Sequence, residues 1–186
     1  MAESENRLHI YTGDGKGKTS VAVGMAIRAI GAGMSVAFLQ FDKGYDGGED
    51  FYNERKILRR FDSVYLFASG MSRINEDGGF RMGVTEEDLL EAGVGLEKAA
   101  ALINGRRYNM VILDEAITSA GYGLFGKEDI MNLVQIWMSA GKPCELVMTG
   151  RGAWDELIDA ADLVSEVKKV KHYYDNGHPA KRGVEY

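Results

Sequence analysis

A chain of 186 residues and 20.5 kDa, 45% of it hydrophobic, has the size and composition of one globular domain over residues 1–186 and is too short for two. Its net charge of −6 argues against nucleic acid as the main partner, and because no apolar run reaches the length of a bilayer span, no membrane association is expected. The single cysteine, Cys144, excludes an internal disulfide, and residues 1–6, expected to be flexible, lack signal-peptide character, so a cytoplasmic location is predicted.

The first motif has the pattern of a phosphate-binding loop. A short apolar run at residues 8–11, typical of a buried strand, precedes it, and an apolar helical pattern follows it as far as a glycine stop at residues 31–33. The motif reads Thr12-Gly13-Asp14-Gly15-Lys16-Gly17-Lys18-Thr19-Ser20. Its glycines let several backbone N–H groups point at one anion, and the N-terminal end of the helix adds positive charge.

Two side chains of this loop carry the expected chemistry. Lys18 is predicted to reach the terminal phosphates of a nucleotide, and the Thr19 hydroxyl is predicted to hold Mg²⁺. Three residues separate Gly13 from Gly17, one fewer than in the usual pattern, so the loop is a shortened variant. An ordinary glycine-rich turn with solvent-exposed lysines is the alternative.

Residues 35–41 are nearly all apolar and predict a second buried strand in a parallel sheet covered on both faces. A glycine-rich loop follows at residues 42–48, so Gln40, Asp42 and Lys43 either face a nucleotide or its co-substrate or belong to a solvated loop. A short helix is expected over residues 50–61. Its basic residues predict a solvated face and are Arg55, Lys56, Arg59 and Arg60.

A third strand is predicted at residues 64–67, and the glycine-rich segment 68–84 is interpreted as a lid or binding loop, or else as disordered. Thr85 has the character of an N-cap for a helix that reaches about residue 105. Residues 110–113 form an apolar strand that ends in Asp114 and Glu115, the second half of a nucleotide-binding signature. These two carboxylates are expected to hold Mg²⁺ directly or through water.

The rest of the chain continues the alternation of strands and helices. Residues 116–125 are expected to be a connection, residues 128–139 and 154–161 helices, and residues 145–149 and 163–167 strands. In the turn at residues 150–152, Arg151 either touches phosphate or pairs with a loop carboxylate. The whole pattern predicts an α/β fold with a mainly parallel sheet of approximately six strands flanked by helices.

The C-terminal tail, residues 168–186, differs in charge from the rest of the chain. It holds five lysines and arginines against two carboxylates, a net charge of +3. The tail either folds over a phosphate ligand or is a solvated end. His172 and His178 lack the spacing of a zinc site, so no zinc is expected there.

Six segments taken together resemble the ATP:corrinoid adenosyltransferases of the cobalamin pathway, and the likeness covers nearly the whole chain in order. The segments are TGDGKGKTS at residues 12–20, VAFLQFDKG at 36–44, VILDE at 111–115, MTGR at 148–151, VKHYYDNG at 170–177 and AKRGVEY at 180–186. The shortened phosphate loop is the rule in that family. The resemblance implies a P-loop, RecA-like fold of three layers.

The resemblance also implies a reaction. A corrinoid (cobalamin or a precursor) reduced to Co(I) attacks C5′ of ATP, which lies in the loop in the opposite orientation to that in ordinary ATPases, and triphosphate is expelled. By the same resemblance residues 13–20 bind the triphosphate, and Thr19, Asp114 and Glu115 lie around Mg²⁺ (or Mn²⁺) or the ribose. We take Lys16, Lys18 and Glu115 as catalytic candidates and add Arg151 to the nucleotide-binding set. A homodimer and an external electron donor, such as a flavoprotein, are also implied.

Members of that family carry a Phe-x-Trp pair that pushes away the lower ligand of the corrinoid. The nearest match here is Phe80-Arg81-Met82, so Phe80 and Met82 either perform this displacement or pack the loop onto the core. Two other functions stay open. One is a P-loop ATPase or small-molecule kinase acting at the γ-phosphate, in which Glu115 orients a water or an acceptor, and the other is a non-catalytic protein that binds nucleotide or corrinoid.

Overall fold

The computed structural model describes residues 5–44, 51–71, 73 and 81–186. Within them six strands form one sheet in the order β3-β2-β4-β5-β1-β6, and every pair of neighbours is parallel. The strands are β1 (Leu8–Thr12), β2 (Val36–Gln40), β3 (Val64–Ala68), β4 (Met110–Asp114), β5 (Glu145–Thr149) and β6 (Leu163–Glu166). The prediction of a parallel α/β sheet is confirmed.

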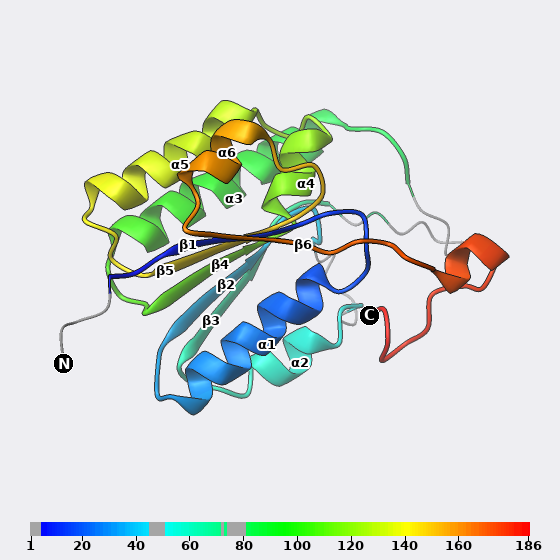
Figure 1. Cartoon of the computed structure of the whole chain (residues 1–186), viewed down its shortest axis with the longest axis horizontal. Helices are drawn as coiled ribbons and strands as arrows, with labels where there is room; N and C mark the ends of the chain where they lie inside the picture. The colour runs from blue at the N-terminus through cyan, green and yellow to red at the C-terminus, as the bar shows by residue number, and fades with distance from the viewer. Residues whose placement is uncertain (1–4, 45–50, 72, 74–80) are drawn as a thin grey trace.

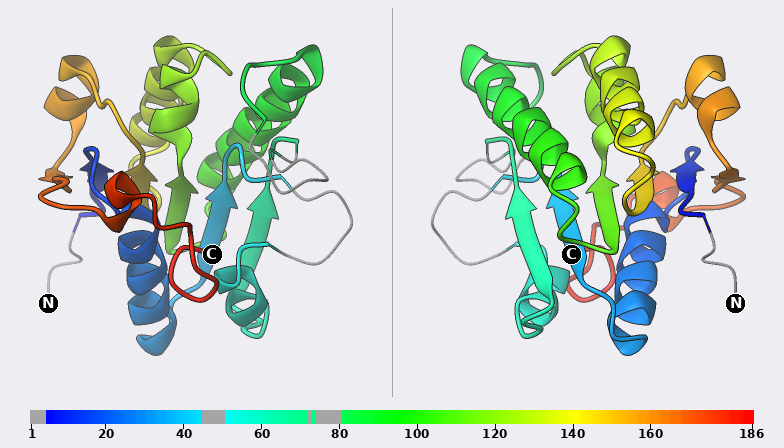
Figure 2. Two further views of the ribbon diagram at one scale, coloured as in Figure 1. Left: turned by 90° about the vertical axis from the view of Figure 1, so that its right-hand side faces the viewer. Right: turned by 90° about the vertical axis from the view of Figure 1, so that its left-hand side faces the viewer.

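Helices cover both faces of the sheet, which gives three layers (Figures 1 and 2). One face carries α1 (Lys18–Gly31) and α2 (Glu54–Leu58). The other carries α3 (Glu86–Asn104), α4 (Ala116–Gly121), α5 (Lys127–Ser139) and α6 (Asp155–Ala160). A short 3₁₀ helix, η1 (Tyr173–Asn176), lies in the C-terminal tail. In the part of the chain that the structure describes, every helix is too short or too polar to span a bilayer.

The expectation that residues 116–125 form a plain connection is wrong, because α4 occupies the first part of this segment. Ala116, Ile117 and Ala120 are buried in the core, so tertiary packing stabilises a helix of only six residues, which would be marginal on its own. The helix expected over residues 50–61 is present but shorter, at Glu54–Leu58. Thr85 caps α3 as predicted, since its hydroxyl accepts from the Asp88 N–H at 3.3 Å.

The two central strands β2 and β4 are buried along their whole length, and apolar side chains fill the space on both sides of them. On the α5 side, Trp137 is fully buried and its indole N–H donates to the carbonyl of Cys144 at 2.8 Å. Burial raises the pKa of the Cys144 thiol to about 12, so this cysteine is an unreactive core residue at neutral pH.

The register of the strands brings four chain segments to one edge of the sheet. Gln40 pairs with Asp114 across β2 and β4, and Tyr11 pairs with Thr149 across β1 and β5. Because all strands are parallel, their carboxyl ends lie at the same edge, where ligands bind in open α/β sheets. The phosphate-loop motif after β1 and the two carboxylates at the end of β4 are therefore neighbours, with β5 between their strands.

The basic face predicted for α2 holds only in part. Arg59 and Arg60 are exposed, but Arg55 has an exposed fraction of 1%. The Nε atom of Arg55 donates to Gln40 Oε1 at 2.6 Å, the guanidinium also donates to the Lys43 carbonyl, and the Tyr52 ring lies beside it. The prediction was wrong for Arg55 because the charge pattern of a helix does not reveal a polar partner on a neighbouring strand.

At the N-terminus, Glu5 and Asn6 belong to the segment expected to be flexible. Both contact Lys142: the Glu5 carboxylate pairs with its ammonium at 2.9 Å, and the Asn6 amide donates to its carbonyl at 2.9 Å. Residues 1–4 lie outside the described residues.

Candidate active site

The loop between β1 and α1 depends on its glycines for two physical reasons. Gly17 has a φ of 124°, in the region that favours glycine, and it turns the chain into α1. A Cβ atom on Gly13 or Gly15 would lie 2.5 or 2.7 Å from the carbonyl oxygen of Val167. The N–H of Gly15 also donates to that oxygen at 2.7 Å. The segment after β6 therefore packs directly against the loop and helps to fix its shape.

Lys18 lies at the centre of this loop and has an exposed fraction of 5%. Its ammonium donates to the carbonyl oxygens of Gly13 at 2.7 Å and Gly15 at 2.8 Å, so the loop curls around the side chain. Burial lowers the pKa of Lys18, and the negative charge of Glu115 opposes that shift.

Asp114 is completely buried, and its carboxylate accepts hydrogen bonds from four side chains. Its carboxylate accepts from Thr149 Oγ1 at 2.7 Å, Lys43 Nζ at 2.8 Å, Thr19 Oγ1 at 3.2 Å and Gln40 Nε2 at 3.3 Å. Burial by itself raises the pKa of Asp114, but the Lys43 charge and these hydrogen bonds outweigh it and hold the pKa below the ordinary aspartate value. Asp114 is therefore ionised at neutral pH.

Arg55 orients the amide of Gln40. Because Arg55 donates to Gln40 Oε1, the amide nitrogen is left to donate to Asp114 and, at 3.1 Å, to Glu54 Oε1. Gln40 was one of three residues for which the sequence left two interpretations open. It lies beneath the site as a buried support of Asp114, so neither interpretation applies to it.

The backbone turns sharply at Glu115, which has a φ of 61°. Its N–H donates to Thr149 Oγ1 at 2.9 Å, and its carboxylate accepts from the Thr118 hydroxyl in the first turn of α4. Thr118 Oγ1 in turn accepts from the backbone N–H of Arg151 at 2.8 Å. The strained turn is thus held by contacts on both sides and aims Glu115 away from the core, toward a cavity over the sheet edge.

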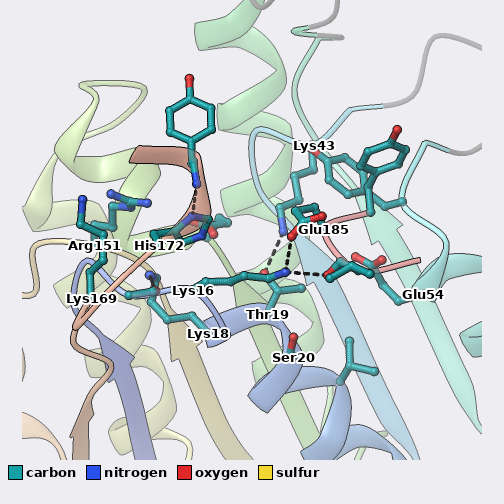
Figure 3. Close-up of a pocket in the computed structure, with 18 of the residues that line it drawn as sticks. Lys16, Lys18, Thr19, Ser20, Lys43, Glu54, Arg151, Lys169, His172 and Glu185 are labelled. Atoms are coloured by element: carbon teal, nitrogen blue, oxygen red, sulfur yellow. Dashed lines mark hydrogen bonds and ion pairs between the residues drawn. The ribbon is translucent and has the colours of Figure 1, made fainter. Parts of the chain in front are cut away.

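The cavity over this sheet edge has a volume of about 910 Å³ (Figure 3). From the predicted site it is lined by Asp14, Gly15, Lys16, Gly17, Lys18, Thr19, Ser20, Glu115 and Arg151. Gly13 and Asp114 do not line it, and Asp114 is completely buried. Arg151 is 60% exposed and 4.0 Å from the Asp14 carboxylate, so it lines the cavity and faces a loop carboxylate at once.

Met82, one of the two corrinoid-facing candidates, is 77% exposed and does not line this cavity. Phe80, the other candidate, lies outside the described residues. Asp42 also points elsewhere, since its carboxylate accepts from Arg73 Nε at 2.8 Å. Lys43, in contrast, lines the cavity next to Tyr52.

Residues of the C-terminal tail form part of the cavity wall. The tail runs out to η1 and returns, so that the end of the chain lies beside α1 and α2 (Figure 1). The Lys16 ammonium donates to Glu185 Oε1 at 2.6 Å and to the Val184 carbonyl at 2.8 Å. The rings of Tyr186 and Phe51 stack with their centroids 4.0 Å apart. His172, Lys169 and Tyr174 complete this wall.

Sequence reasoning assigned no role to Thr149 or Glu185, although both contact predicted site residues. Thr149 ends a predicted strand, which was the available signal, but only the strand order reveals that β5 lies between the loop strand and the carboxylate strand. Glu185 is 169 residues from its partner Lys16 along the chain, and no local pattern links them.

Replacing Thr149 with valine is expected to lower the free energy of unfolding by about 1–3 kcal/mol, because a buried donor and acceptor lose their partner. The hydroxyl donates to Asp114 and accepts from the Glu115 N–H, so both carboxylates lose a fixed position. Urea unfolding measures the change. Thr149→Ser keeps the hydroxyl and serves as the control; equal losses in both variants would contradict a role for the hydrogen bonds.

Comparison with known proteins gives a consistent result along the whole chain. A family model described as ATP:corrinoid adenosyltransferase BtuR/CobO/CobP matches residues 4–186. The corrinoid adenosyltransferase of Pseudomonas aeruginosa is 33% identical over 184 residues, which cover 96% of this chain and 83% of the relative. That of Salmonella typhimurium is 29% identical over 188 residues, 99% of this chain and 87% of the relative. The chain therefore belongs to the ATP:corrinoid adenosyltransferase BtuR/CobO/CobP family.

Proposed function

We propose that this protein transfers the 5′-deoxyadenosyl group of ATP to the Co(I) centre of a reduced corrinoid and releases triphosphate. The observation that carries the proposal is the cavity in which the glycine loop, Lys18, Glu115 and Arg151 come together, in a chain of this family. A cavity of about 910 Å³ has the size expected for a nucleotide site. The relatives' names, corrinoid adenosyltransferase, agree with this assignment.

The chemistry needs placement and charge stabilisation rather than a base. The electron pair of Co(I) forms the Co–C bond to C5′, the C5′–O bond breaks, and its electrons leave with the triphosphate. Lys18 and Lys16, together with loop N–H groups, would stabilise the charge that grows on the leaving group. Glu115 and Arg151, which line the same cavity, would also contact the nucleotide.

A divalent cation, Mg²⁺ or Mn²⁺, would be held by Thr19 and Asp114, with Glu115 nearby. Their donors are oxygen atoms, which these hard cations prefer. The fit is supported by the ionised, buried Asp114 carboxylate, which already attracts one cation, and by the Thr19 hydroxyl 3.2 Å from it. When bound, the ion would neutralise part of the negative charge of the polyphosphate.

Further parts of the proposal extend beyond the nucleotide cavity. We propose that residues 1–186 act as one domain, that the protein is a cytoplasmic homodimer, and that an external donor such as a flavoprotein supplies electrons. A reducing compartment suits a Co(I) substrate and a chain whose single cysteine is buried.

Phe80 and Met82 are proposed to meet the lower face of the corrinoid. The net charge of −6 argues against nucleic acid as a partner.

The test is to mix the protein with ATP, Mg²⁺ and chemically reduced cobalamin and to follow the absorption spectrum and the phosphate products together. We expect a light-sensitive alkylcobalamin and one equivalent of triphosphate. Orthophosphate or a phosphorylated acceptor would instead indicate an ATPase or kinase acting at the γ-phosphate. Binding of ATP or corrinoid without a spectral change would indicate a non-catalytic binding protein.

A further inference from the structure

The ammonium of Lys43 lies between the two side chains proposed to hold the divalent cation. Its Nζ atom is 2.8 Å from Asp114 Oδ2 and 3.0 Å from Thr19 Oγ1, and those two oxygen atoms are 3.2 Å apart. Figure 3 shows Lys43 reaching down toward Thr19. The side chain of Lys43 is 11% exposed. A positive charge of the protein itself therefore lies against the same pair of oxygen atoms that a metal ion would use.

The backbone at Lys43 is held independently of its side chain. The Lys43 N–H donates to the Ser69 carbonyl at 3.1 Å, and its own carbonyl accepts from Arg55. The ammonium, by contrast, ends a flexible four-carbon chain, so it can leave Asp114 by rotation about side-chain bonds while the backbone stays in place. Tyr52 offers a nearby surface, since its ring centroid is 5.1 Å from the ammonium.

An ammonium and a divalent cation cannot share these two oxygen atoms, because they would lie within a few ångströms of each other at a site with little water. One must leave when the other arrives. Lys43 already lines the cavity, so if its ammonium moves outward it moves further into that cavity, where the triphosphate would supply anionic oxygen atoms as new partners. Arrival of the nucleotide would then make departure of the ammonium from Asp114 easier.

We propose that Lys43 is an internal cation that occupies the divalent-metal position until the metal displaces it, so that Lys43 couples metal binding to the arrival of the triphosphate. This inference rests on the proposed function, because it takes Thr19 and Asp114 as metal ligands. Lys43 acts as a positioning residue through Asp114. Its role is to keep the buried carboxylate paired and the site closed to metal until the nucleotide is present.

The test is a titration with Mn²⁺ in the absence of nucleotide, read by the electron paramagnetic resonance signal of the free ion. Lys43→Met is expected to bind Mn²⁺ at least about 10-fold more tightly than the wild type, because Asp114 loses its competing charge. Lys16→Met is the matched control, since it removes a cavity lysine that pairs with Glu185 rather than Asp114. It is expected to change the Mn²⁺ affinity by less than about threefold.

Two further variants keep the test decisive if Lys43→Met folds poorly. Lys43→Gln keeps a hydrogen-bond donor for Asp114 without the charge, and it should show the same tighter binding. Lys43→Gln combined with Asp114→Asn should lose the gain. Thermal unfolding gives a second readout, in which millimolar Mn²⁺ should raise the Tm of Lys43→Gln more than that of the wild type. If folded Lys43→Met or Lys43→Gln binds Mn²⁺ no more tightly than the wild type, the proposal is overturned.

The Mn²⁺ titration uses no corrinoid and no catalysis, so its outcome is separate from that of the adenosyl-transfer assay. If adenosyl transfer occurs but the loss of Lys43 gives no gain in Mn²⁺ affinity, the Lys43 inference alone is overturned. If the gain appears but no alkylcobalamin forms, competition between Lys43 and metal is supported and the proposed reaction is not.

Discussion

Lys18→Ala is expected to lower kcat for adenosyl transfer by at least about 10²- to 10³-fold, the usual cost of removing one preorganised group that stabilises developing charge. Lys18 is the buried cation of the loop, and the carbonyl oxygens of Gly13 and Gly15 hold its ammonium in place. Such a fixed charge stabilises a departing triphosphate more than a mobile one does. Formation of adenosylcobalamin with excess Co(I), measured under single-turnover conditions, reports the chemical step.

Lys16→Ala is the matched control, because Lys16 lines the same cavity but is partly exposed and pairs with Glu185 at the chain end. We expect a smaller loss, about 10-fold, since a solvated lysine is less well oriented. Both variants should keep the Tm of the wild type within a few degrees. A Lys18→Ala protein that folds normally and turns over at the wild-type rate would contradict the role given to the loop.

Asp114→Asn is expected to lower the free energy of unfolding by about 3–5 kcal/mol, more than Thr149→Val does, because it leaves the buried ammonium of Lys43 without its counter-charge. Four donors converge on the Asp114 carboxylate, and an amide cannot accept from all of them. Urea unfolding gives the loss in stability. Adenosyl transfer should also be lost, since a proposed metal ligand is removed.

A second substitution separates these two effects. In Asp114→Asn combined with Lys43→Met no buried charge is left without a partner, so most of the lost stability should return, whereas adenosyl transfer should not. If Asp114→Asn alone unfolds at the same urea concentration as the wild type, the four hydrogen bonds to the Asp114 carboxylate do not stabilise the fold as proposed. If the double variant regains activity, Asp114 is not a metal ligand.

The sequence was informative where local patterns reflect the fold. Runs such as residues 35–41 and 110–113 predicted buried parallel strands correctly, because strands covered on both faces are apolar throughout. Asp114 could be placed near Thr19 from the sequence, since both follow strands whose carboxyl ends share one edge.

The parts that were not predicted depend on contacts between distant segments. Arg55 is buried because Gln40, on a neighbouring strand, accepts from it, and Thr149 reaches Asp114 because β5 lies beside β4. Residues 116–121 form α4 because the sheet buries their apolar side chains. The contact between Lys43 and Asp114 was likewise not predictable from the sequence. It depends on the turn at the neighbouring Asp42, which has a φ of 53°.

The most direct test of where the nucleotide is attacked uses ATP carrying ¹⁸O at the oxygen that joins C5′ to the α-phosphorus. Mass spectrometry of the released phosphates after reaction with Co(I) cobalamin follows the label. Attack at C5′ breaks the C5′–O bond, so we expect the heavy oxygen in an intact triphosphate, in equal amount to adenosylcobalamin. Label that stays with the nucleoside, together with unlabelled orthophosphate, would show attack at the outer phosphorus and contradict adenosyl transfer.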